Sequence, residues 1–140
     1  MSPIVWQDVL PRVQTAAAAI GLVVSLPNED AGPRAIPPAP WLDIEVAAES
    51  AGAMEMGGRL WLERGSIFLH VMIPVGTGVL PGLTLRKALS VAFRNVQNAP
   101  AGLIYSREGQ AFDPMGPGTD DGVYRRLTLI VRYDYQDITT

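Results

Sequence analysis

The sequence predicts an α+β protein, in which two helices pack on one face of a mainly antiparallel (mixed) β-sheet. Apolar residues recur at spacings of three and four in two segments and alternate with polar residues in the others. The order along the chain is helix, strands, helix, strands, which is typical of helices gathered on one face of an antiparallel sheet. With 140 residues, of which 48% are hydrophobic, the chain is expected to form a single domain over residues 1–140.

The first element is predicted to be a helix from Ser2 to Ile20. Ser2 suits the N-cap and Pro3 the first turn, where a backbone N–H has no partner. The apolar face comprises Trp6, Val9, Leu10, Val13, Ala17 and Ile20. Pro11 removes a hydrogen bond inside this helix. We therefore expect either a kink there or a regular helix that begins only at Asp8.

A short strand is expected at Leu22–Leu26, followed by a linker over residues 27–40. Five of these fourteen residues are proline, which favours an extended backbone on the protein surface.

A β-meander is predicted next. Trp41–Val46 alternates, with Asp43 and Glu45 opposite the apolar residues. A turn is expected over Glu49–Gly58, and a long strand over Arg59–Ile73. The apolar face of that strand comprises Ile67, Leu69, Val71 and Ile73. Gly65 indicates a bulge or bend in its middle.

The second helix is predicted at Leu83–Val96, after a turn at Gly76–Gly78. Its apolar stripe comprises Leu85, Leu89, Ala92, Phe93 and Val96, with Arg86, Lys87 and Arg94 on the outside. This spacing is typical of a helix that covers a sheet.

The last third is predicted to be β-structure. Short strands are expected at Gly102–Ser106 and Gln110–Phe112, and the longest alternating strand at Val123–Tyr135. Between them, residues Asp113–Gly122 form an acidic loop rich in glycine and proline.

Some apolar residues fall on the sheet face opposite the predicted core. Phe68 and Met72 oppose the Ile67 face, and Ile130 opposes the Leu129 face. A sheet that is apolar on both faces indicates either a neighbouring subunit or a second covering helix. The sequence leaves these two alternatives equal.

Residues with catalytic chemistry are sparse. The chain has no cysteine, so thiolate nucleophiles, disulfides and cysteine metal sites are excluded. His70 is the one histidine, and a single histidine without cysteine cannot form an ordinary zinc site. We interpret it as a structural residue, half-buried or at a subunit contact, and we expect no enzyme activity, cofactor or metal.

Three other groups of residues partly match known functional sites, but each lacks a required feature. Asp43 and Glu45 share a strand face but resemble ordinary solvent-facing positions. The acidic loop lacks the ligand spacing of a calcium loop. Gly76-x-Gly78 followed by Gly82 lacks the Gly-Lys-Ser/Thr ending of a phosphate-binding loop.

The formal net charge is −3 and the isoelectric point is about 5.0. No basic stripe of the kind that binds nucleic acid is present. The apolar run Ala16–Val24 is far shorter than the ~20 residues of a membrane span. We therefore expect neither nucleic-acid binding nor a membrane anchor.

Four stretches together resemble the tail terminator-like proteins of long-tailed bacteriophages. They are PPAPWLDIEV, RGSIFLHVMIPVGTG, LRKALSVAF and YRRLTLIVRYDY, which lie between about Trp41 and Tyr135. The resemblance lies in the order of elements rather than in one motif.

The resemblance implies a structural virion protein, assembled in the host cytoplasm, that forms a homohexameric ring on the head-proximal end of the tail. Its partners would be further copies of itself, the tail tube protein and the neck or head-closure protein, with DNA only passing through the lumen. Alternatives are another head–tail connection protein, or a small ligand-binding domain that uses the loops around Gly76–Gly82.

In such a ring, we expect the long strands Arg59–Ile73 and Val123–Tyr135 to form the scaffold. The loops Glu49–Gly58 and Asp113–Gly122 would reach the tube or the neck. The predicted interface residues are Met54, Met56, Phe68, His70, Met72, Asp113, Met115, Asp120, Asp121 and Arg125.

Overall fold

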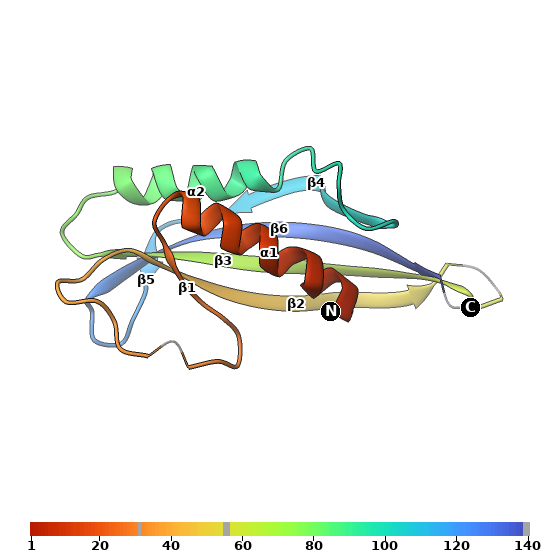
Figure 1. Cartoon of the computed structure of the whole chain (residues 1–140), viewed down its shortest axis with the longest axis horizontal. Coiled ribbons are helices and arrows are strands. Elements are labelled where there is room, and N and C mark those ends of the chain that lie inside the picture. Colours follow the sequence, from red (N-terminus) through yellow and green to blue (C-terminus); the bar gives the residue numbers. More distant parts are fainter. Residues whose placement is uncertain (31, 55–56, 139–140) are drawn as a thin grey trace.

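A computed structural model describes residues 1–30, 32–54 and 57–138, and confirms the α+β class (Figure 1). The helices are α1 (Pro3–Ala19) and α2 (Leu80–Ala92). The strands are β1 (Val23–Ser25), β2 (Trp41–Ala53), β3 (Leu60–Pro74), β4 (Leu103–Phe112), β5 (Gly116–Pro117) and β6 (Tyr124–Ile138).

The strands form one six-stranded sheet in the order β1-β2-β3-β6-β4, with β5 also paired to β6. β1 is parallel to β2, and every other pair is antiparallel. The two longest strands, β3 and β6, therefore lie inside the sheet. β3 pairs with β2 on one side and β6 on the other, and the outer side of β6 pairs in part with β4 and β5.

Both helices pack on the same face of the sheet, as predicted. That face is built from alternating residues of the central strands, because side chains of a strand point to opposite sides. The largest fully buried side chains include Leu42, Ile44, Ile67, Leu69, Ile73, Leu129 and Tyr133 from the sheet, and Val5, Val9, Val13, Leu89 and Phe93 from the helical segments. We call the opposite side of the sheet the open face.

α1 buries a narrower stripe than the sequence predicts. Val5, Val9, Val13 and Ala17 are buried at strict spacings of four, whereas Trp6 is only partly buried. The row therefore consists of small apolar side chains, three valines and one alanine. Pro11 lies inside the helix and is exposed, so water can satisfy the carbonyl that its missing N–H leaves free.

α2 begins and ends earlier than predicted. Pro81 occupies the first turn, a position that proline favours, so the helix starts at Leu80 rather than after the proline. It ends at Ala92, and Asn95 adopts a left-handed conformation with φ of 52°. Phe93, just beyond the last turn, remains fully buried.

β2 continues as a strand well into the predicted turn. The turn predicted at Glu49–Gly58 is strand up to Ala53, paired with β3 as far as Trp61. The register shifts between Ala48 and Ser50, so the extra residue is Glu49 in β2, not Gly65 in β3. Gly65 has a different role. A Cβ there would lie 2.5 Å from the Ala47 carbonyl oxygen, so only glycine allows this close approach.

β4 is one irregular strand where two short strands were predicted. Leu103–Tyr105 and Gln110–Phe112 both pair with β6, and the register shifts between them. Ser106 and Gly109 take left-handed conformations, with φ of 57° and 87°. The intervening residues therefore bulge from the sheet edge.

The start of α1 is fixed to the sheet by Glu63, which is 9% exposed. Its carboxylate accepts hydrogen bonds from the Ser2 backbone N–H at 3.1 Å, the Ser2 hydroxyl at 2.8 Å and the Tyr133 hydroxyl at 2.6 Å. Burial alone raises the pKa of Glu63. The hydrogen bonds from Tyr133 and Ser2 outweigh that effect, so the pKa lies below the ordinary value of 4.5.

Glu63 is therefore expected to make folding stability depend on acid pH. A carboxyl group with a lowered folded-state pKa stabilises the fold above its unfolded pKa, and this contribution is lost as pH falls through the folded pKa. Glu63→Gln should lower the free energy of unfolding at pH 7 by about 1–3 kcal/mol. It should also lose less stability than the wild type below pH 4.5, measured by urea denaturation across pH. Glu29→Gln, at an exposed position, is the control; equal pH profiles for all three proteins would contradict the prediction.

Candidate functional site

The proline-rich segment, residues 27–40, covers one end of the open face. Trp41, Met72 and Tyr124 form a second, smaller buried cluster there. The rings of Trp41 and Tyr124 meet edge-on with centroids 5.9 Å apart. The Arg34 guanidinium lies 3.3 Å from the centroid of the Trp41 ring. Met72 is therefore 5% exposed, and the predicted interface residue is buried within its own chain.

His70 lies beside this cluster on the open face and is 6% exposed. Its Nδ1 is 2.7 Å from the Thr128 hydroxyl oxygen, and its Nε2 is 3.4 Å from a carboxylate oxygen of Glu45. Its ring stacks on that of Phe68, which is partly buried. Next to His70 in the sheet is Asp43, whose pKa is raised mainly by burial. His70 is more deeply buried than predicted, and its contacts are those of a packed residue.

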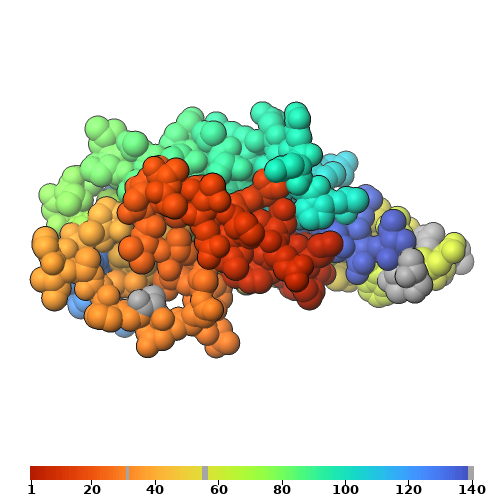
Figure 2. All heavy atoms as spheres, in the orientation of Figure 1, coloured from red at the N-terminus to blue at the C-terminus, as the bar shows by residue number. Residues whose placement is uncertain are grey.

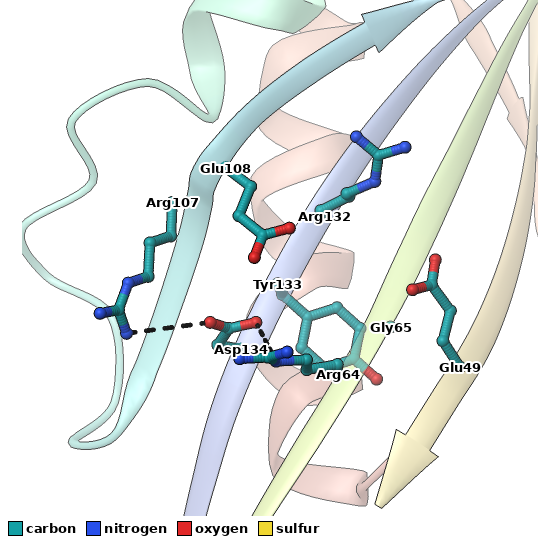
Figure 3. A pocket seen from close by; sticks show the side chains of 8 residues that line it. All are labelled: Glu49, Arg64, Gly65, Arg107, Glu108, Arg132, Tyr133 and Asp134. Atoms are coloured by element: carbon teal, nitrogen blue, oxygen red, sulfur yellow. Dashed lines mark ion pairs between the residues drawn. The ribbon is translucent and has the colours of Figure 1, made fainter.

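The middle of the open face carries a balanced charge network (Figure 3). Asp134 pairs with Arg64 at 3.6 Å and with Arg107 at 4.0 Å. The Ser66 hydroxyl donates to Glu49. The network residues are Glu49, Arg64, Arg107, Glu108, Arg132 and Asp134, around a cavity of about 20 Å³. Such a volume holds about one water molecule, so the network is not a substrate pocket.

Among the described residues, no cluster of three or more possible ligands could hold a metal ion. Within the same ranges, neither helix combines the length and apolar character needed to cross a membrane.

The glycines after β3 have packing and turn roles. Gly76 and Gly78 have positive φ in open surroundings, as a tight turn requires. A Cβ at Gly82 would lie 2.3 Å from a methyl carbon of Leu127. Gly82 therefore lets α2 approach the sheet, and nothing in this contact favours a phosphate site.

One end of the long axis is a three-stranded arm, in which β2, β3 and β6 extend beyond both helices (Figure 1). The space-filling view shows the same narrow projection (Figure 2). Its exposed apolar residues are Met54 at 51%, Trp61 at 41% and Ile138 at 69%. Met54 was predicted at an interface, whereas Met56 lies outside the described residues. Trp61 and Ile138 were not singled out, because their exposure depends on how far the strands extend beyond the helices.

The other end of the long axis carries the acidic loop, which contains a short strand and is held by several hydrogen bonds. Its middle forms β5, and the Arg86 side chain donates to the Asp113 carbonyl at 2.8 Å. Asp121 accepts hydrogen bonds from the Thr119 hydroxyl and from the Val123 backbone N–H. These bonds lower the pKa of Asp121.

Most of the predicted interface residues in and beside this loop are exposed, but one is not. Asp113, Asp120, Asp121 and Arg125 are exposed. Met115 is partly buried and packs against the main core, so it serves to hold the loop in place. The arm and the acidic loop therefore lie at opposite ends of the molecule (Figure 1). The exposed apolar residues of the arm contrast with the exposed carboxylates of the loop.

Comparison with known proteins shows a fold relationship only. No protein-family model matches the chain, and no curated protein matches it. One solved structure is similar over 100% of this chain and 99% of its own, with a TM-score of 0.68 and 20% sequence identity. The name of that protein indicates no activity. At this identity, the likeness shows that the two chains share a fold.

Proposed function

We propose that the chain is a structural protein of a long-tailed phage particle: a tail terminator that forms a homohexameric ring on the head-proximal end of the tail tube. It stops tube polymerisation and docks to the neck or head-closure protein. The observation that carries this proposal is the chemical difference between the two ends of one long sheet.

A ring subunit between two different partners needs two unlike end surfaces and two lateral surfaces that meet further copies. The arm offers one end, with exposed Met54, Trp61 and Ile138. The loop with exposed Asp113, Asp120 and Asp121 offers the other. The net charge of −3 fits a ring through which DNA slides, because a negative wall repels phosphates.

The proposal is tested with particles that lack this protein. Without a terminator, tails should be overlong and unattached to heads in electron micrographs. Tails of normal length that fail to attach would instead assign the chain to another neck component. Normal infectious particles would overturn both assignments.

The role of the acidic loop is tested by supplying the phage that lacks this protein with a double variant, Asp120→Ala with Asp121→Ala. We expect at least a tenfold loss of infectious titre, because the variant removes two exposed carboxylates from one end surface. The matched control is Glu29→Ala with Asp30→Ala, which removes the same charge from another exposed turn. Wild-type titre for both double variants would show that the loop makes no essential contact.

A further inference from the structure

The outer edge of β2 is free over most of its length. β1 pairs only with Trp41–Asp43. From Ile44 to Ala53, no strand in the described part of the chain pairs with that edge. The backbone N–H and C=O groups on such an edge form a template for another strand.

This edge has few of the features that protect edge strands from pairing. β2 contains no lysine and no proline, and its outer half, Ala47–Ala53, consists of small residues apart from Glu49. The bulge at Glu49 is one residue long. β4, at the opposite edge of the sheet, is shorter and carries the larger bulge described above. Small side chains leave the backbone of β2 accessible. The free edge of β2 can therefore form backbone hydrogen bonds with a strand of another chain.

The charges along the two sheet edges indicate which strand of another copy can pair with β2. β2 carries Asp43, Glu45 and Glu49 and no cation, so two β2 edges facing each other would bring carboxylates together, which is unfavourable. The β4 edge carries exposed Arg107 beside exposed Glu108, and exposed Arg94, which follows α2, lies near that edge. Beside it runs a groove of about 500 Å³, lined by Arg94, Ile104, Gln110 and Phe112 among others.

Glu49 on the β2 edge and Arg107 on the β4 edge also lie at similar positions along the strand direction. Glu49 and Arg107 lie across the same charge network, separated by β3 and β6 (Figure 3). A second copy displaced sideways by the width of the sheet would therefore place its Glu49 beside Arg107. β2, β3, β6 and β4 alternate in direction, so the new pair would be antiparallel, like its neighbours.

We infer that β2 of one copy pairs antiparallel with the β4 edge of the next copy, so that the sheet continues from subunit to subunit. This contact joins two different surfaces, and repeated contacts of this kind close into a ring when the rotation between copies allows it. The inference rests on the proposed ring function and identifies the lateral interface of that ring.

Introduced cysteines test the inference, because the chain has none of its own. Ser50→Cys marks the β2 edge and Glu108→Cys the β4 edge; both positions are exposed, and Arg107 is kept. The two single variants are mixed and treated with a short bismaleimide. A covalent dimer is expected from the mixture and not from either variant alone. A chain that carries both substitutions should give a ladder of products that ends at the closed ring. Gln14→Cys on the exposed side of α1, mixed with Glu108→Cys, is the control and should stay uncoupled.

Native mass spectrometry of the same samples, with and without purified tail tubes, separates the possible failures. A ring without cross-linking between the two edges would overturn the edge pairing and leave the terminator proposal intact. Dimers from Ser50→Cys alone would replace the inferred contact with a symmetric β2–β2 contact. A monomer under both conditions, with no cross-link, would overturn the ring and the edge pairing together.

Discussion

Gly65→Ala is expected to lower the free energy of unfolding by about 2–3 kcal/mol, as overpacking of a tightly fitted site does. The added Cβ would lie 2.5 Å from the Ala47 carbonyl oxygen and 2.5 Å from the Tyr133 hydroxyl oxygen. The first contact is with backbone and cannot be relieved by a rotamer change. The second would displace Tyr133 from Glu63, so the anchor of α1 would weaken as well.

The matched control is Gly52→Ala, in the neighbouring strand, where a Cβ meets nothing within 4 Å. This variant should stay within about 0.5 kcal/mol of the wild type. Urea denaturation followed by circular dichroism measures both. If the two variants were equally stable, the close approach of β2, β3 and β6 at Gly65 would be wrong.

Phe93→Ala is expected to lower the free energy of unfolding by about 3–5 kcal/mol, the usual range for removing a buried aromatic ring. Phe93 is fully buried, and its ring meets that of Tyr105 edge-on with centroids 5.2 Å apart. Tyr105 in turn donates a hydrogen bond to Asp8 at 2.6 Å. The substitution therefore leaves a cavity where α1, α2 and β4 meet.

Val91→Ala is the control for Phe93→Ala, since Val91 lies in the last turn of α2 and is 52% exposed. It should change stability by no more than about 0.5 kcal/mol. A loss at Phe93 no larger than the loss at Val91 would mean that α2 does not pack as described.

The elements that could be predicted from the sequence are those whose own side-chain pattern specifies them. In β3, alternation from Ile67 to Ile73 identifies the buried face whatever strands lie beside it, because side chains of a strand alternate by geometry alone. The same reasoning predicted β6 and the buried position of Phe93. Each of these depends on local periodicity and on no knowledge of topology.

Strand order and strand length depend on partners far along the chain. Ala47–Ala53 has low intrinsic preference for a strand, and pairing with β3 makes it one. For the same reason, the sequence could not reveal that β4 and most of β2 lie at the sheet edges, or that β3 and β6 lie inside.

The candidate surfaces were predicted in part. Met54 and the three aspartates in the acidic loop, which were predicted at interfaces, are exposed. Burial of Met72 was not predicted, because it depends on Arg34 and Trp41 covering that end of the open face. The exposure of Trp61 and Ile138 likewise depends on an arm whose length only the assembled sheet defines.

The direction of the strands has a mechanical consequence. β3 and β6 are each 15 residues long and paired over their whole length, and they run along the long axis of the molecule (Figure 1). A pulling force between the two ends would load their hydrogen bonds in shear, so many bonds would have to break together. The same force applied across the sheet would open the bonds one after another. Single-molecule stretching from the arm to the acidic loop should therefore need a higher rupture force than stretching from β2 to β4.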